Sequence, residues 1–525
     1  MTPGVRDANR VVPASQLPSL SGVNLTKERG TTTLDSAIDT ASIGGTVAAS
    51  NGLVHIIDTV TPPAPEPWQA RPMEDFDLVI VGSGSGNAIP PAFDDARVAL
   101  VERGVFGGTC LNVGCIPSKM FIYAADIALH VTEAERYGVH ATLDGVDWPA
   151  IRDRIFGRID PIAEGGERYR IEDCENITVL RGSGAFVDHK VLEVEGERIR
   201  GDRFLLAAGA RPFVPDVPGL ADAGYHTSDT VMRLDELPGR MAILGGGYIA
   251  TELGHVFEAF GTEVSIVNRS GALLRSEDAD ISARYTEIAA GRFDLHLATR
   301  VRSVARTGDG AITLELDGRG GASTLEVDEV LVATGRIPNS DQLAVERTGV
   351  RTDAAGRIIV HENLETDVEG IYALGDITNR HQLKHVANAE AKVAFHNLAH
   401  PDDQRRMDYS IVPHAVFGNP QVGAVGLTEL QAADDGLPFV TATKEYATTA
   451  YGWAMEDTTS FVKLVAHAQT RRLLGAHIIG PQASTLVQLL VQAMRFGQTV
   501  DEMAREQMWV HPALTEVIEN TLLDL

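Results

Sequence analysis

Two cysteines lie close together in the stretch GGTCLNVGCIPSK, which covers residues 107–119. They are Cys110 and Cys115, and the 525-residue chain contains only one further cysteine, Cys174. A disulfide between the first two would close so small a loop that the chain-entropy model gives only about 2 kcal/mol of stability. A cysteine at a helix start, as the stretch suggests, has its thiolate favoured by the helix dipole. The pair therefore indicates dithiol redox chemistry.

A metal site is the alternative use of paired cysteines. Zinc needs two such pairs, or added histidines at close spacing, to complete a tetrahedral shell. Cys174 stands alone in IEDCEN, with no metal-ligating cysteine or histidine near it in sequence. We therefore predict no metal site, and we expect Cys174 to be a buried or inert thiol.

The first of two glycine turns follows a buried strand in DFDLVIVGSGSGN, residues 75–87. Gly82 and Gly84 suit the tight turn and close backbone approach that bind a dinucleotide pyrophosphate at a helix N-terminus. Glu102, 20 residues after Gly82, ends a second strand, where a carboxylate holds a ribose hydroxyl. Asn87 replaces the expected third glycine and two prolines follow, so we expect a short or bent helix. Alone, such a turn could also be a structural loop.

A second strand, glycine turn and helix occur in GRMAILGGGYIATEL, residues 239–253. Gly245 and Gly247 occupy the first two glycine positions, and Ala250 at the third is small enough for close helix packing. Two units of this kind predict two dinucleotide-binding domains.

The strand after the second turn ends differently from that of an NAD site. Asn268 stands where NAD-binding sites place an acid, and Arg269 and Arg275 follow it. Arginine binds a phosphate bidentately, whereas an acid would repel the 2′-phosphate of NADPH. We therefore predict a preference for NADPH, with two solvated surface arginines as the alternative interpretation.

The overall composition excludes several classes of partner. With 45 basic and 72 acidic residues, the formal net charge is −27, and no cluster of basic residues offsets it. Nucleic acid and anionic membranes are thus not expected partners. The first residues lack the apolar core of a signal peptide, and no stretch is apolar enough to span a bilayer. With so few cysteines, we expect a cytoplasmic protein in a reducing compartment.

The chain is long enough for several domains. Residues 61–72, TPPAPEPWQARP, contain five prolines and read as an extended linker. Near the C-terminus we expect a hairpin in SFVKLVAHAQTRRLLGAHIIG and a helix in TLVQLLVQAMRF that Ser484 could cap. We predict that the chain divides into five parts. These are an extension at 1–60, a linker at 61–74, an FAD-binding domain at 75–215 and 336–400, an NADPH-binding domain at 216–335, and an α+β dimerisation domain at 401–525.

Six motifs appear in the order typical of one family. GGTCLNVGCIPSK, GGGYIA, VLVATGRIPN, GIYALGDI, VGLTE and HPALTE make residues 75–525 resemble the flavin-dependent pyridine nucleotide-disulfide oxidoreductases. The resemblance implies an α/β fold with two Rossmann-like domains and a C-terminal dimerisation domain. It also implies FAD and NADPH as cofactors and a homodimer.

The resemblance assigns roles to residues of the matching motifs. Cys110 would attack the substrate disulfide, and Cys115 would lie against the flavin. His511, oriented by Glu516, would be an acid-base contributed by the partner subunit, which suits an imidazole at neutral pH. The other implied residues are Lys119 paired with Glu252 beside the flavin, Thr109 and Asp376 at FAD, and Tyr248 and Gly335 at NADPH.

Substrate choice within the family rests on shorter stretches. FGRIDPIA, YHTSDTVMR and YGWAMEDT most resemble the mycothione reductases, which reduce the small-molecule disulfide of mycothiol. Lipoamide dehydrogenase and glutathione reductase share most of the longer motifs and stay as alternatives, although Asn268 argues against the first. Mercuric reductase is disfavoured because the C-terminal TLLDL lacks a further cysteine pair.

The segment before the linker suggests a function of another class. TVAASNGLVHIIDTVTPP and RVVPASQL resemble parts of a fasciclin-type adhesion domain, of which only about half is present. Half of a β-rich fold cannot pair all its strands, so we expect it to be poorly ordered or docked. The alternative is an adhesion or binding module fused to a reductase.

Overall fold

The computed structural model divides the chain into two compact units, Met1–Met73 and Glu74–Leu525. It describes the side chains of residues 73–308 and 310–525, and backbone strands before them. Those strands form two antiparallel pairs, which are β1 (Asn24–Glu28) with β2 (Thr31–Asp35) and β3 (Thr40–Ala49) with β4 (Gly52–Thr61). The linker and much of the fasciclin-like segment fall outside the described residues, and that resemblance stays a prediction.

The first large sheet is built on the strand before the first glycine turn. Its central strand, β5 (Glu74–Val81), pairs in parallel with β6 (Val98–Glu102) and β10 (Glu197–Leu206). Such a strand is covered on both faces, which explains its continuous apolar run. The sheet continues through parallel β7 (Ile177–Arg181) and β20 (Ile371–Ala373) and antiparallel β8 (Gly184–Asp188) and β9 (Val191–Val194).

The helix expected after this turn does not form. Only two short 3₁₀ turns follow, η2 (Ser85–Asn87) and η3 (Pro91–Phe93). Proline lacks an N–H and its ring clashes with the preceding helical turn, so the chain cannot continue as an α-helix here. Arg170 of α3 (Trp148–Glu172) instead donates hydrogen bonds of 2.8 Å to both Oδ1 and the carbonyl oxygen of Asn87. The prediction of a helix dipole behind Gly82 and Gly84 was therefore wrong.

The second glycine turn has the predicted strand–turn–helix form. The helix α5 (Tyr248–Ala259) begins directly after Gly247. This helix packs on a parallel four-stranded sheet. The strand order of the sheet is β14 (Asp294–Leu297), β13 (Glu263–Asn268), β12 (Arg240–Leu244) and β18 (Glu329–Val332). An antiparallel sheet of β15 (Arg300–Arg306), β16 (Ile312–Gly318) and β17 (Gly321–Val327) and the helix α6 (Ala279–Ala289) belong to the same region.

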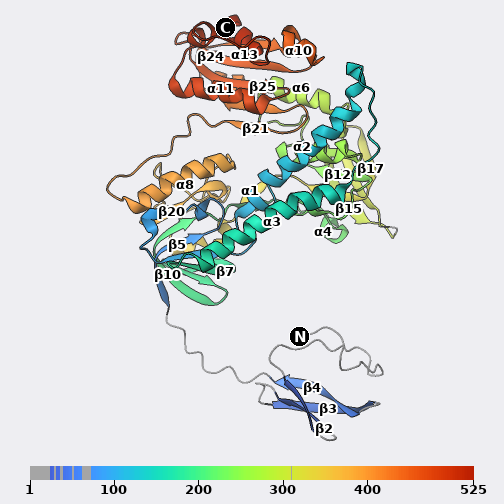
Figure 1. Ribbon diagram of the computed structural model, residues 1–525, viewed down its shortest axis with the longest axis vertical. Helices are drawn as coiled ribbons and strands as arrows, with labels where there is room; N and C mark the ends of the chain where they lie inside the picture. The colour runs from blue at the N-terminus through green and yellow to red at the C-terminus, as the bar shows by residue number, and fades with distance from the viewer. Residues whose placement is uncertain (1–23, 29–30, 36–39, 50–51, 62–72, 309) are drawn as a thin grey trace. The chain divides into compact units, whose positions relative to one another are not determined.

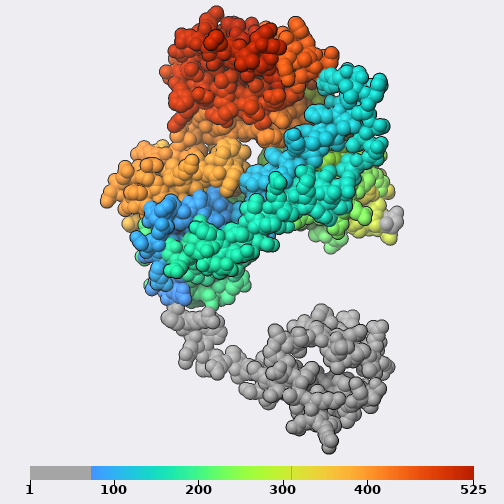
Figure 2. Space-filling model, viewed as in Figure 1, coloured from blue at the N-terminus to red at the C-terminus, as the bar shows by residue number. Residues whose placement is uncertain are grey.

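The C-terminal region is an antiparallel sheet covered by helices, shown as the red lobe in Figure 2. The predicted hairpin is confirmed as β24 (Phe461–His467) and β25 (Leu473–Ile479). The helix α11 begins at Ala483, so Ser484 lies inside it and does not cap it; its hydroxyl donates to Gln421 Oε1. The other elements are β21 (His414–Val416), β22 (Val422–Gly426), β23 (Phe439–Glu445), α9 (Glu429–Asp434), α10 (Ala450–Ala454), α11 (Ala483–Phe496), α12 (Val500–Arg505) and α13 (Thr515–Asp524).

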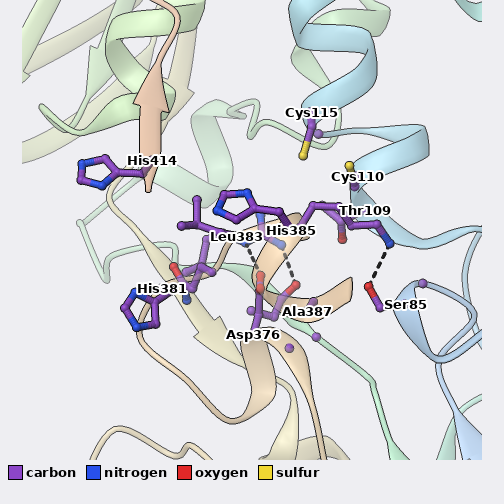
Figure 3. Close-up of a pocket in the computed structure, with 18 of the residues that line it drawn as sticks. Ser85, Thr109, Cys110, Cys115, Asp376, His381, Leu383, His385, Ala387 and His414 are labelled. Carbon is purple, nitrogen blue, oxygen red and sulfur yellow. Dashed lines mark hydrogen bonds and ion pairs between the residues drawn. The ribbon is translucent and has the colours of Figure 1, made fainter. Parts of the chain in front are cut away.

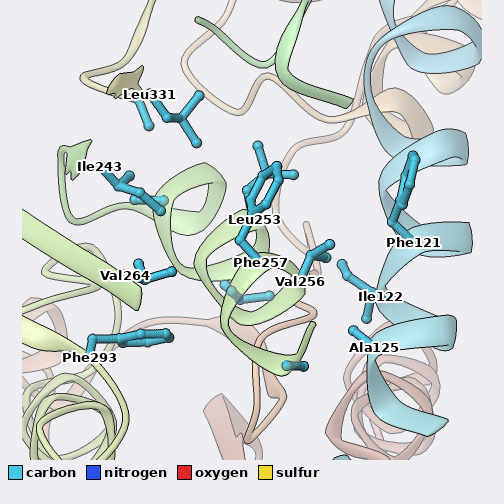
Figure 4. Packing of buried hydrophobic residues seen from close by; sticks show 14 of the residues in the cluster. Phe121, Ile122, Ala125, Ile243, Leu253, Val256, Phe257, Val264, Phe293 and Leu331 are labelled. Atoms are coloured by element: carbon cyan, nitrogen blue, oxygen red, sulfur yellow. The ribbon is translucent and has the colours of Figure 1, made fainter. Parts of the chain in front are cut away.

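The helix that begins at Cys115 packs on the helix of the second glycine turn. Figure 4 shows Phe121 and Ile122 of α2 (Cys115–Thr132) facing Val256 and Phe257 of α5. Burying an aromatic or branched side chain of this size stabilises the fold by about 1.5–3 kcal/mol. This contact therefore fixes the cysteines relative to the second nucleotide-binding region.

Further elements connect these parts (Figure 1). The connecting elements are α1 (Gly108–Asn112), η4 (Ala134–Tyr137), β11 (Ala210–Pro212), α4 (Leu220–Ala223), η5 (Val231–Arg233), β19 (Arg336–Pro338), α7 (Ser340–Leu343), η6 (Val345–Thr348), η7 (Gly375–Ile377), α8 (Lys384–Ala399) and η8 (Tyr446–Thr448). Among the described residues, no helix is both long and apolar enough to cross a membrane.

A buried lysine joins the C-terminal sheet to the second nucleotide-binding region. Lys463 Nζ lies 2.9 Å from Asp278 Oδ1 and 2.6 Å from both Asp280 Oδ2 and Glu429 Oε2. The side chains of Lys463 and Asp278 are only 4% and 1% exposed. Removing one charge of such a pair leaves the other buried without compensation.

We expect Lys463→Met to lower the free energy of unfolding by about 3–5 kcal/mol, measured by urea denaturation. The matched control is Lys444→Met on the neighbouring strand, because Lys444 pairs with Asp524 at the surface and such pairs contribute about 0–1 kcal/mol. Equal losses in the two variants would contradict a special role for the buried network.

Candidate active site

The two predicted redox cysteines face each other at a helix junction. Cys110 lies in α1, and Cys115 is the first residue of α2. Both are free thiols, and both line the same cavity. Figure 3 shows the two sulfur atoms pointing toward one another at the edge of a cavity. The geometry suits a pair that alternates between dithiol and disulfide.

The two thiols differ in acidity because the pKa of one is raised and that of the other is lowered by their surroundings. The hydrogen bond from Cys110 lowers the pKa of Cys115 to about 7, and the nearby Lys119 ammonium acts in the same direction. The same hydrogen bond, together with burial, raises the pKa of Cys110. The reduced pair therefore holds its first negative charge on Cys115.

Lys119 and Glu252 meet beside this thiolate. Lys119 Nζ lies 2.6 Å from Glu252 Oε2, and the glutamate side chain is only 6% exposed. The other glutamate oxygen accepts a 2.9 Å hydrogen bond from the backbone N–H of Phe417, whose ring lies 4.7 Å from Lys119 Nζ. The structure therefore brings this predicted pair together and positions it by contacts from three segments.

A cavity of about 2140 Å³ contains the first glycine turn and both thiols. Gly82 has a φ of +105°, and a Cβ there would lie 2.4 Å from the carbonyl oxygen of Ala207. Glu102 Oε2 accepts hydrogen bonds from the Ser83 N–H and hydroxyl at 2.9 and 2.7 Å. The turn and its carboxylate are thus in contact, as their spacing predicted.

Most of the other residues assigned to the first nucleotide site also line this cavity. They include Gly84, Thr109, Lys119 and Asp376. Burial raises the pKa of Asp376, while the charges of Arg336 and Lys384 act against that rise. The carboxylate accordingly shares the cavity with two cations, of which Arg336 lies 4.0 Å away.

The residues predicted to bind NADPH lie outside this cavity, apart from Tyr248. Asn268 ends β13 and is 7% exposed, with its amide donating to the carbonyl oxygen of Ala272. Arg269 and Arg275 are exposed, and neither forms an ion pair with any described carboxylate. Gly245 and Gly335 adopt positive φ values of 127° and 124°.

The structure does not bring His511 to the cysteines of its own chain. His511 does not line the cavity, and its side chain is 72% exposed. Its Nδ1 contacts Glu516 Oε1 at 2.5 Å, so the predicted orienting pair is present. The pair is complete but lies away from the thiols.

Sequence reasoning missed several residues of the cavity. Lys384 and Ser85 contact each other in it, and Arg336 lies within the quoted motif VLVATGRIPN but was not singled out. Asn112 was also missed; its amide donates to three backbone carbonyls, while its buried Oδ1 has no partner among the described residues. Arg336, Asn112 and Ser85 each lie within a quoted motif, whereas Lys384 lies outside them and had no such signal.

The reduced protein should form a thiolate with a midpoint near pH 7. Since the pKa of Cys115 is lowered, its thiolate should be populated above this midpoint and lost as the pH falls through it. Thiolate absorbance near 240 nm in a Cys174→Ser background measures the transition without the third thiol. The transition should disappear in Cys115→Ser; a thiolate that forms only near the ordinary value of 9.0 would contradict the geometry.

Comparison with known proteins finds two matching family models. Residues 76–392 match the family model described as pyridine nucleotide-disulphide oxidoreductase, and residues 412–522 match its dimerisation domain. The HOCl-induced flavoprotein disulfide reductase RclA from Escherichia coli has a similar structure, with a TM-score of 0.74 and 27% sequence identity. That similarity covers 86% of this chain and 99% of the other.

Curated relatives match most of the chain. A mycothione reductase from Mycobacterium tuberculosis is 47% identical over 464 residues, which are 86% of this chain and 100% of the relative. A mercuric reductase from Staphylococcus aureus is 36% identical, over 82% and 79% of the two chains. A dihydrolipoyl dehydrogenase from Chlamydia muridarum is 33% identical, over 86% and 97%. The chain therefore belongs to the pyridine nucleotide-disulphide oxidoreductase family and is an FAD-dependent disulfide reductase that uses a nicotinamide nucleotide.

Proposed function

We propose that this protein uses NADPH to reduce the disulfide of mycothiol through Cys110 and Cys115. The two free thiols that face each other in the cavity are the observation that carries the redox assignment, and the lowered pKa of Cys115 supports it. The substrate is inferred from the 47% identity to a mycothione reductase. The small number of cysteines fits a reducing compartment, and we infer the cytoplasm.

The residues of the large cavity fit FAD. The orphaned Asn112 Oδ1 is an acceptor that the described residues leave free. Glu102 at the glycine turn suits a ribose hydroxyl, and Asp376 suits the hydroxyls of the ribityl chain. Bound FAD supplies a two-electron carrier between the nicotinamide and the disulfide. Thr109 and Lys119 would complete its surroundings, and Tyr248 would cover the nicotinamide side.

The chain's own residues then carry the thiol chemistry. Cys110 attacks one sulfur of the substrate, which forms a mixed disulfide and releases the first thiol. Cys115 next attacks Cys110, which releases the second thiol and leaves a Cys110–Cys115 disulfide. An imidazole can accept the Cys110 proton and return it to the leaving thiolate.

We assign this proton transfer to His511 of the partner subunit. In one chain His511 is exposed and paired with Glu516, close in sequence to Met508 and Val510, which are 100% and 71% exposed. Such exposed apolar residues favour an interface. The dimerisation-domain match supports a homodimer in which each site takes residues from both subunits.

Steady-state assays with mycothiol disulfide, glutathione disulfide and lipoamide, each with NADPH and NADH, test the substrate assignment. We expect the highest kcat/KM for mycothiol disulfide with NADPH. A higher value for either other disulfide would contradict the assignment.

The enzyme should prefer NADPH by about tenfold to a hundredfold in kcat/KM. Each charged hydrogen bond to the 2′-phosphate contributes about 1.5–3 kcal/mol, and solvent exposure of Arg269 and Arg275 reduces this. Changing both to alanine should raise KM for NADPH and leave KM for NADH nearly unchanged. Arg319→Ala, an exposed arginine on the β16–β17 turn, is the control. Equal use of both nucleotides by the unmodified enzyme would refute the phosphate site.

His511→Ala should slow reduction of the substrate disulfide by about a hundredfold and leave flavin reduction by NADPH almost unchanged. Stopped-flow measurement of the two half-reactions separates these effects, because proton transfer serves only the thiol half. A parallel loss in both halves would show that His511 acts elsewhere.

Mixed dimers test whether the site is shared. Combining the His511→Ala and Cys110→Ser chains should restore activity, because a heterodimer contains one complete site. No recovery after demonstrated subunit exchange would place His511 outside the partner's site.

A further inference from the structure

Lys384 places a second ammonium in the cavity that holds the redox thiols. It is the first residue of α8 and lines the cavity together with Cys110 and Asp376. Its Nζ lies 2.9 Å from Ser85 Oγ, and that hydroxyl contacts Asn388 Oδ1 at 3.1 Å. Figure 3 shows Ser85 beside Thr109, on the Cys110 side of the thiol pair.

This ammonium is not neutralised by a direct ion pair. No described carboxylate lies within ion-pair distance of Lys384, whereas Lys119 and Lys463 each contact a buried glutamate or aspartate. Its polar contact is the neutral hydroxyl of Ser85. Lys384 therefore keeps its positive charge available to anions in the cavity, in a chain whose formal net charge is −27.

The charges around the two sulfur atoms are divided between two lysines. Cys115 is flanked by Lys119 and by the opposing carboxylate of Glu252. The hydrogen bond with Cys115 and burial raise the pKa of Cys110, and Lys384 is the cation that lowers it. Asp376 lines the same cavity and partly offsets the charge of Lys384. Lys119 therefore acts on Cys115, and Lys384 acts on Cys110.

We propose that Lys384 stabilises the thiolate of Cys110 during attack on the substrate disulfide, as Lys119 stabilises that of Cys115. The inference rests on the proposed function. Reduction of the disulfide by two electrons and one proton gives one thiol and one thiolate, with the charge first on Cys115. Attack requires Cys110 to lose its proton to a base; its sulfur then bonds to one substrate sulfur, and the substrate S–S bond breaks. A cation beside Cys110 favours this anion.

The test compares Lys384→Met, which removes the charge, with Lys384→Arg, which keeps it. Lys392→Met is the matched control, because Lys392 is exposed on the same helix and does not line the cavity. The FAD-loaded variants are reduced with dithiothreitol and reacted with iodoacetamide across a pH series, and peptide mass mapping locates the alkylated cysteine. Long-wavelength absorbance of the thiolate beside the flavin reports Cys115 separately.

Lys384→Met should slow alkylation of Cys110 about tenfold at neutral pH and move its pH profile upward by about one unit. The long-wavelength absorbance and its pH midpoint should stay unchanged, and Lys384→Arg and Lys392→Met should behave as the unmodified enzyme. Unchanged alkylation in Lys384→Met would overturn the proposal. If Lys384→Met and Lys384→Arg lost Cys110 alkylation and long-wavelength absorbance to the same extent, the proposal would also be overturned. Such a result would indicate that Lys384 has a structural role. Chemical reduction keeps this result independent of which nucleotide or disulfide the enzyme uses.

Discussion

The contact between Lys119 and Glu252 holds the active site together. One carboxylate oxygen of Glu252 accepts a hydrogen bond from Lys119 of α2, and the other accepts one from the N–H of Phe417, directly after β21 of the C-terminal sheet. Glu252 itself belongs to the helix of the second glycine turn. The oxygens of a buried carboxylate need hydrogen-bonding or ionic partners. Glu252 therefore constrains three parts of the chain at one point, which are α2, α5 and the segment after β21. The position of the thiolate depends on that constraint.

The charge of the cavity contrasts with that of the whole chain. The chain is strongly acidic, yet Lys119, Lys384 and Arg336 all line the space that contains the thiols. Positive groups favour the anions that the proposed chemistry forms, which are thiolates and a reduced cofactor. The carboxylates of Glu252 and Asp376 partly offset these positive charges and position the side chains of Lys119 and Arg336. The site therefore concentrates positive charge where negative charge develops.

Local patterns predicted much of the fold but less of the site. The two buried strands with glycine turns, the thiol pair and the C-terminal hairpin depend on short-range periodicity and turn residues, which a sequence displays directly. The prolines after the first turn signalled a disturbed helix, although not its complete loss to 3₁₀ turns. Lys384 lies far from Cys110 in sequence, and only tertiary packing brings it to the cavity. His511 was predicted by resemblance, and in a single chain it lies outside the cavity that holds the thiols.

The central claim is that Cys110 and Cys115 exchange electrons with NADPH through the flavin. Anaerobic titration of the FAD-loaded protein with NADPH, followed by visible absorbance, tests it most directly. We predict a long-wavelength band from the Cys115 thiolate beside the flavin, present in the unmodified protein and absent in Cys115→Ser. A band that persists in Cys115→Ser, or none in the unmodified protein, would contradict this account.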